Sequence, residues 1–287
     1  MNNKPYTLTF YSWRKPDHPN DIQCSVQMIA YYIWEAFSKL QHVEMRYFES
    51  EDPSPVPQSD FSLVHDYFQS AIYRRLPEIR ANTSKKITTI MESPFDSPLI
   101  DRAFTFLPIP RPNATQIRLP CPMAALMAHN RAKRPGSVLL DHQWIERGVQ
   151  TDLPLYRCVS QMNEVAQLRR PGRESQLAPD WVITIPKAGY IDYLDATACY
   201  ETFILTHPGS YEHSIIDMAA RGARVFVPVR ERPFCHPSIV EDLGLFTFRT
   251  SQELRALLEG PPANAIDRFT DMPDVVARID EYFQQSL

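Results

Sequence analysis

A run of side chains that can bind an anion lies in the second half of the chain. It contains His207, Gly209, Ser210, Tyr211, Glu212, His213, Ser214 and Asp217. The Pro-Gly pair at 208–209 predicts a tight turn, and Ser210 is a suitable N-cap for a helix that follows it. The free amides and positive dipole end of such a helix favour a phosphate, and the nearby hydroxyls and imidazoles add further donors. This run therefore predicts a phosphate-binding turn.

The elements on either side of this turn would position it at the edge of a sheet. Residues 203–205 form an apolar strand end, Gly222 stands where a helix C-cap belongs, and residues 224–228 form a short buried strand. A helix that begins just beyond the carboxyl end of a strand opens into the crevice where open α/β sheets bind ligands. The pattern thus predicts a strand–helix–strand unit with a ligand at its turn.

The same segment resembles a known signature. Matching positions are His207, Gly209, Ser214, Asp217, Ala219, Gly222 and Pro228. Together they are similar to the nucleotide-sugar signature in the C-terminal domain of GT-B glycosyltransferases, and the likeness covers roughly the second half of the chain. It implies an α/β fold of two Rossmann-like domains with a cleft between them. It also implies that Asp217 holds the donor ribose and that the helix start holds the diphosphate.

Two departures from that signature limit what it implies. Asp217 stands where the family more often has Glu, and Gly209 stands where retaining enzymes have a second acid. The resemblance therefore indicates the fold and the class of donor, and leaves retention or inversion open. Asp217 as a solvated acid on the outer face of its helix is the alternative for this residue.

Further donor contacts are expected from two loops. Lys187, Tyr190 and Ile191 fall between a predicted strand and a helix over residues 193–200, where the family presents backbone groups to the nucleotide base. Tyr190 and Ile191 are then expected to form the wall for a uracil or guanine, and Lys187 to neutralise the diphosphate or to remain a surface lysine. Arg230, after the last strand of the signature, suits a phosphate or an anionic acceptor, or is a surface arginine.

The acceptor needs a general base if the reaction inverts. The candidates follow predicted strands of the first half: Asp17 and His18 after the first strand, His65 and Asp66 after the third, and Glu92 and Asp96 after the fourth. No motif selects among them, and Asp17, His18 and Glu92 are taken forward as the catalytic candidates. No pair of acids suggests a metal site, and neither a metal nor any other cofactor is expected beyond the donor itself.

Composition sets the class of protein. The chain has 287 residues, 44% of them hydrophobic and 22% charged, which is typical of globular domains. The net charge of −4 divides into +3 over residues 1–135 and −7 over residues 136–287. The small positive excess suits an anionic acceptor, or is only a solvated surface. Five scattered cysteines indicate reduced thiols, and no apolar run is long enough for a membrane span, so a cytoplasmic protein is expected.

Alternating strands and helices predict two βαβ domains. Their expected limits are 1–133 for an acceptor-side domain, 134–272 for a nucleotide-sugar-binding domain and 273–287 for a terminal helix that packs back towards the first domain. A helix is also expected over residues 151–167, and a polar linker over residues 129–136.

The sequence thus predicts a hexosyl- or pentosyltransferase that uses a UDP- or GDP-sugar. The acceptor is a saccharide, a lipid-linked sugar or a modified DNA base. A sugar-nucleotide epimerase of the same fold and a non-catalytic GT-B-like binding module are the alternatives, because the fold alone does not settle the activity.

Overall fold

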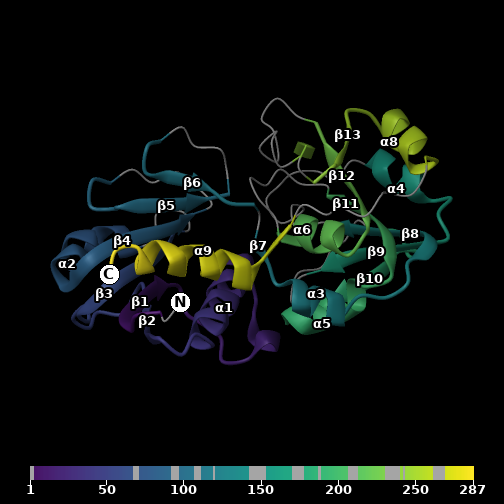
Figure 1. Cartoon of the computed structure of the whole chain (residues 1–287). Helices are drawn as coiled ribbons and strands as arrows, with labels where there is room; N and C mark the ends of the chain where they lie inside the picture. Colours follow the sequence, from purple (N-terminus) through teal and green to yellow (C-terminus); the bar gives the residue numbers. More distant parts are fainter. Residues whose placement is uncertain are drawn as a thin grey trace. The chain divides into compact units, whose positions relative to one another are not determined.

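The computed structural model describes the chain except for residues 1–2, 67–70, 92–96, 107–110, 119, 142–152, 170–177, 187–188, 206–212, 230–239, 242 and 261–268. The described residues form two compact units (Figure 1). Unit 1 comprises Met1–Pro122 and Phe269–Leu287, and unit 2 comprises Met123–Arg268. Each unit is built on a six-stranded parallel sheet, so the predicted α/β class is confirmed.

Unit 1 contains the first half of the elements and the last helix. Its strands are β1 (Tyr6–Ser12), β2 (Val43–Glu49), β3 (Ser59–Asp66), β4 (Thr83–Met91), β5 (Arg102–Thr105), β6 (Ala114–Gln116), β7 (Pro120–Cys121) and β14 (Thr270–Asp271). Its helices are η1 (Pro19–Asp21), α1 (Ser25–Ser38), η2 (Ala71–Arg75), α2 (Leu76–Asn82) and α9 (Met272–Gln284). The main sheet has the strand order β2-β1-β3-β4-β5-β6. Strands are added on one side of β1 up to β2 and on its other side from β3 onward, so the strand order reverses between β1 and β3.

The terminal helix α9 belongs to unit 1, where it contacts α1 (Figure 1). Its apolar stripe is buried, and Phe283 stacks on Phe61 of β3 with ring centroids 4.3 Å apart. A polar cluster adds to this packing. Tyr6 Oη donates to Asp280 Oδ1 at 2.7 Å, and His42 Nε2 lies 2.9 Å from the same oxygen. The carboxylate of Asp280 therefore joins α9 to the strand β1 and to the residue that precedes β2.

Unit 2 contains the remaining elements. Its strands are β8 (Arg134–Asp141), β9 (Glu164–Arg169), β10 (Ile183–Pro186), β11 (Tyr200–Leu205), β12 (Arg224–Pro228) and β13 (Phe246–Phe248). Its helices are α3 (Met123–Ala128), α4 (Leu153–Val159), α5 (Tyr190–Thr197), α6 (His213–Ala220) and α8 (Ser251–Leu258). The sheet order β10-β9-β8-β11-β12-β13 is that of a Rossmann fold.

Alternation along the strands of unit 2 assigns each face of the sheet to different helices. Val138 and Leu140 of β8 pack with Ile204 of β11 in a core that includes residues of α4 and α8. Because successive side chains of a strand point to opposite faces, Asp141 lies on the other face. That face is the one towards α6, because Asp141 is bonded to Ser214 of that helix.

Three sequence predictions differ from the structure here. The helix expected over residues 151–167 ends at Val159, and residues 164–169 form the strand β9 instead. The strand is buried between β8 and β10, so tertiary pairing overrides the helical pattern. The helix expected at residues 193–200 begins three residues earlier, at Tyr190, behind the N-cap Gly189. Part of the polar linker, from Arg134 onward, instead forms the first residues of strand β8.

The helix α6 ends as the sequence predicts. Gly222 has a φ of 82°, in the left-handed region that favours glycine. This conformation lets Ala223 N donate to Met218 O at 2.9 Å and Gly222 N to Ala219 O at 3.0 Å, which satisfies the last carbonyls of the helix. The chain then enters β12 directly, so the stop at Gly222 fixes how far α6 extends along the sheet.

Candidate functional site

In the sheet of unit 2, the strands that follow β8 are added on one side up to β10 and on the other side from β11 onward, so the strand order reverses between β8 and β11. At such a point the connections leave the carboxyl ends of neighbouring strands in opposite directions, and ligands bind in the crevice that results. Asp141 is the last residue of β8, Leu205 is its register partner at the end of β11, and α6 is the next described element after β11. The signature segment of the sequence thus borders the expected ligand crevice of its own unit.

An acid at the end of β8 contacts the start of α6. Asp141 is fully buried, and Ser214 Oγ donates to its Oδ2 at 3.4 Å. Ser214 is in the first turn of α6, where the positive end of the helix dipole stabilises a carboxylate. In this arrangement the hydroxyl expected to bind a phosphate bonds to Asp141 instead. Asp141 was not among the residues predicted from the sequence. Its signal is an acid at the end of a buried apolar strand, at the point where the sheet order reverses.

Asp217 lies one turn further along α6 and faces α5. Its side chain is only 1% exposed, and Tyr190 Oη donates to its Oδ1 at 3.0 Å. The alternative of a solvated acid on the outer face of the helix is therefore wrong. Tyr190 is itself buried and belongs to the first turn of α5, so the expected loop position of Tyr190 and Ile191 is also wrong. The structure brings Asp141, Ser214, Asp217 and Tyr190 to one place in unit 2.

Arg221 ties the two helices of the site together. Its guanidinium donates to Leu194 O at 2.7 Å and to Thr197 Oγ1 at 2.8 Å, both in α5, and its Nε donates to Asp217 O at 3.0 Å. These acceptors include the carbonyl groups at the C-terminal ends of both helices, where a cation is stabilised. The arginine is buried, and its bonds fix the spacing between Asp217 and α5.

Tyr193 places a buried hydroxyl near both acids. Burial raises its pKa, the negative charges of Asp217 and Asp141 raise it further, and Arg221 offsets part of that effect. Among the residues that the structure describes, the Tyr193 hydroxyl has no hydrogen-bond partner. It therefore remains a neutral, buried donor at physiological pH.

Lys133 lies behind α5 and provides a test of this part of unit 2. Its Nζ donates to Ala198 O at 2.6 Å, and burial together with the charge of Arg221 lowers its pKa to about 8 from 10.5. At a pH between these two pKa values, Lys133 is protonated in the unfolded chain and largely deprotonated in the folded chain. The free energy of unfolding therefore rises with pH across this range. A Lys133→Met variant lacks this dependence. We expect the unfolding free energy of wild type, measured relative to the variant in urea, to rise by about 1 kcal/mol from pH 7 to pH 10 after allowance for solvent screening. A constant difference across that range would contradict this prediction.

The remaining predicted donor residues have different outcomes. Ile191 is in α5 and half-buried, and His213 is the first residue of α6. Lys187, His207, Gly209, Ser210, Tyr211, Glu212 and Arg230 lie outside the described residues, as does the catalytic candidate Glu92. Their expected roles stay predictions.

Two catalytic candidates of unit 1 are exposed. Asp17 lies in the loop after β1, and His18 is the N-cap of η1, where its Nδ1 accepts from Asn20 N at 3.1 Å. The ring of His18 thus has a local structural role. A different pair lies where the order of this sheet reverses: Ser12 Oγ is 2.9 Å from His65 Nδ1, at the carboxyl ends of β1 and β3, and both residues are buried.

The described part of the chain contains no group of three or more His, Cys, Asp or Glu side chains placed to hold a metal ion. None of its helices is both long enough and apolar enough to cross a membrane.

Comparison with known proteins identifies the fold. No protein-family model and no curated protein sequence matches the chain. Among solved structures, a putative UDP-N-acetylglucosamine 2-epimerase from Listeria monocytogenes is similar, with a TM-score of 0.60 and 12% identity over 99% of this chain and 98% of that one. UDP-GlcNAc 2-epimerase from Neisseria meningitidis bound to UDP-GlcNAc has a TM-score of 0.60 and 10% identity over 97% and 99%. A glycosyltransferase from Rickettsia africae has a TM-score of 0.59 and 10% identity over 98% and 93%.

These likenesses extend over nearly the whole of each chain, which shows that both Rossmann-like units are shared. The protein has the GT-B fold, as the resemblance of the signature segment predicted. The fold is common to glycosyltransferases and to UDP-GlcNAc 2-epimerases, two classes of enzyme that act on nucleotide sugars.

Proposed function

We propose that this protein is a glycosyltransferase that transfers a hexose or pentose from a UDP- or GDP-sugar to an acceptor. The observation that carries the proposal is the cluster of Asp141, Ser214, Asp217 and Tyr190 at the reversal point of the unit 2 sheet. Carboxylates and hydroxyls at this edge suit a ribose and a sugar, and the start of α6 suits a diphosphate. The acceptor is proposed to bind to unit 1.

Each group has a role in this proposal. Asp217 accepts hydrogen bonds from the ribose, and because its side chain is almost fully buried, a ribose hydroxyl binds it in exchange for an existing contact such as the Tyr190 hydroxyl. Tyr190 and Ile191, in the first turn of α5, form a wall beside the nucleotide base. The start of α6 stabilises the departing diphosphate electrostatically, aided by Lys187 and Arg230, without a metal or other cofactor. The acceptor proton passes to a base of unit 1, with Asp17, His18 and Glu92 as candidates.

The proposed setting is a reducing compartment such as the cytoplasm. Within the described part of the chain, Cys24, Cys121, Cys158 and Cys199 form no disulfide. Free thiols of this kind are usual where glutathione keeps cysteines reduced.

A sugar-nucleotide epimerase is the second candidate, because structures of UDP-GlcNAc 2-epimerases match the chain as well as a glycosyltransferase does. A non-catalytic binding module is the third. Incubation of the wild-type protein with UDP-GlcNAc, UDP-glucose and GDP-mannose, followed by NMR of the products, separates the three. With no acceptor present, release of the nucleoside diphosphate together with a free sugar of unchanged configuration at C2, by transfer to water, supports a transferase. A 2-epimer, free or still attached to the nucleotide, supports the epimerase, and binding without turnover of any donor supports the binding module.

A further inference from the structure

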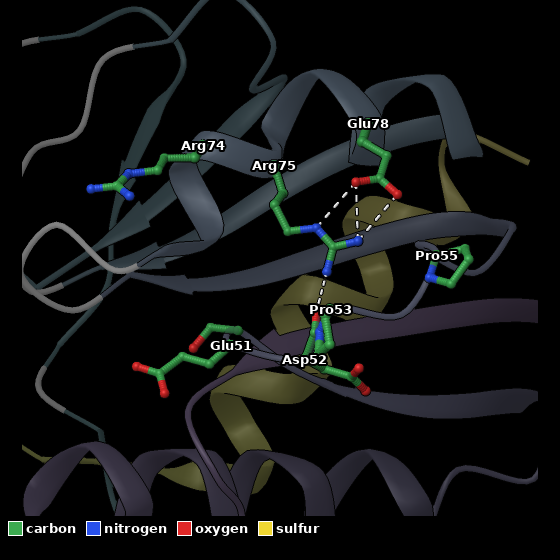
Figure 2. Close-up of a pocket in the computed structure, with 8 residues that line it drawn as sticks. Glu51, Asp52, Pro53, Pro55, Arg74, Arg75 and Glu78 are labelled. Atoms are coloured by element: carbon green, nitrogen blue, oxygen red, sulfur yellow. Dashed lines mark hydrogen bonds and ion pairs between the residues drawn. The ribbon is translucent and has the colours of Figure 1, made fainter.

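An open groove in unit 1 is separate from the donor cluster. It has a volume of about 690 Å³ and lies between the loop that follows β2 and the turn from η2 into α2 (Figure 2). The loop side contributes Glu51, Asp52 and two prolines, and the helical side contributes Arg74, Arg75 and Glu78. We call this feature the η2 groove.

One wall of the η2 groove is fixed by internal bonds. Arg75 donates to both carboxylate oxygens of Glu78, with its Nη2 3.0 Å from Oε2, and to the carbonyl oxygens of Asp52 and Ser54. Glu78 Oε1 also accepts from Val56 N at 3.0 Å. These bonds hold the pKa of the Glu78 carboxyl below its usual value, because the Val56 amide and Arg75 favour the charged form. The polar groups of Arg75 and Glu78 are thereby occupied by bonds that join the loop to the helix.

Two other charged side chains of the groove are not occupied by such bonds. Arg74 and Glu51 are exposed, and within the described part of the chain neither makes a hydrogen bond or an ion pair. Figure 2 shows Arg74 on the helical side and Glu51 on the loop side, with both side chains extending in the same direction, away from Pro55. The groove therefore offers one free guanidinium and one free carboxylate on a fixed frame.

The position of the groove in the sheet also indicates a ligand site. Ser50, which lines the groove, donates its backbone amide to Ser12 O at 2.7 Å, at the carboxyl end of β1. The strand order of the unit 1 sheet reverses between β1 and β3, so the carboxyl ends of these strands are where a ligand is expected to bind. Trp13, next to Ser12, is 47% exposed and adds an aromatic surface at the same edge.

We propose that the η2 groove binds a sugar that carries a single carboxylate or phosphate group, and that this sugar is the acceptor. A guanidinium recognises either anion through paired N–H donors, and a carboxylate accepts hydrogen bonds from sugar hydroxyls. The lining holds three acids against two arginines, so its net negative charge disfavours a polyanion such as DNA. The assignment as acceptor rests on the proposed function, whereas the binding of the anionic sugar does not.

The test compares binding of four probes by ligand-observed NMR titration: glucuronic acid, glucose 6-phosphate, glucose and inorganic phosphate. We expect the two anionic sugars to bind more tightly than glucose or phosphate, and Arg74→Gln to weaken both by about tenfold. Glu51→Gln is expected to weaken the sugars by a few-fold, because it removes the charge that strengthens their hydroxyl bonds. Arg46→Gln is the matched control, since Arg46 is an exposed arginine of the same unit that pairs with Glu44. It should leave all affinities within about twofold.

Several results would overturn the proposal: no binding of either anionic sugar, glucose or phosphate alone binding as tightly as they do, or no effect of Arg74→Gln. Duplex DNA binding that depends on Arg74 would overturn it as well, in favour of a polyanion. The stronger of the two anionic sugars identifies the anion that the site takes. Affinity for UDP- and GDP-sugars is measured on the same variants. If the protein binds a UDP- or GDP-sugar but Arg74→Gln does not weaken binding of the anionic sugars, only the groove proposal is rejected. If Arg74→Gln weakens binding of the anionic sugars but the protein binds no UDP- or GDP-sugar, only the donor site is rejected.

Discussion

Replacing Asp217 with asparagine is expected to weaken binding of the nucleotide-sugar donor by about 10- to 100-fold. The carboxylate accepts hydrogen bonds from ribose hydroxyls in the proposed complex, and an amide accepts them more weakly because it carries no charge. Isothermal titration calorimetry on wild type and Asp217→Asn measures the effect. The substitution keeps the volume of the side chain, so the core around α6 is disturbed as little as possible.

Two further variants separate a role in binding from a role in folding. Tyr190→Phe breaks the bond to Asp217 Oδ1 but leaves the carboxylate in place, so donor affinity should be retained. Asp180→Asn changes an exposed acid of the same unit and should have no effect. If Asp217→Asn retained wild-type affinity, Asp217 would not be the ribose ligand. If Tyr190→Phe lost as much affinity as Asp217→Asn, the Tyr190 hydroxyl would itself be needed for donor binding.

Replacing Asp280 with alanine is expected to lower the unfolding free energy of unit 1 by about 3 kcal/mol. The carboxylate is buried and accepts from Tyr6 Oη, and His42 Nε2 lies within 2.9 and 3.1 Å of its two oxygens. Its removal leaves the buried Tyr6 hydroxyl and the partly buried His42 ring without this acceptor, and the desolvation cost of those groups is then not recovered. Urea unfolding followed by circular dichroism gives the free energy, and hydrogen exchange of α9 reports whether the terminal helix opens first.

The matched control is Glu281→Ala, which truncates the exposed neighbour of Asp280 on the same helix. It should change stability by less than about 0.5 kcal/mol. Equal effects of the two substitutions would show that the loss comes from helix propensity and not from the buried cluster. A loss below about 1 kcal/mol for Asp280→Ala would show that packing of Phe283 and its neighbours holds α9 without the carboxylate.

The strand–helix–strand segment of β11, α6 and β12 was predictable because its sequence signals are local. An apolar strand end, a Pro-Gly turn and a glycine stop each act within a few residues, and Gly222 adopts the left-handed conformation expected of it. The identity of the fold followed from the same segment. The sequence could not predict that residues 164–169 form β9, because that strand depends on pairing with β8 and β10.

Side-chain partners were harder to predict than elements. Asp141 and Ser214 are 73 residues apart, and their bond depends on the register of β8 against β11 and on where α6 begins. The bond between Tyr190 and Asp217 depends on Tyr190 being in the first turn of α5, a shift of three residues from the predicted helix start. Small errors in the limits of elements thus change which groups meet, even where the elements themselves are right.

Unit 2 is proposed to bind a nucleotide-diphosphate sugar. The most direct test is a thermal-shift panel of UDP-, GDP-, dTDP- and CMP-sugars on the wild-type protein, since a ligand that binds only the folded state must raise its stability. We expect a concentration-dependent rise in Tm with one UDP- or GDP-sugar, and competition by the matching nucleoside diphosphate. No rise with any of these compounds at millimolar concentration would contradict it.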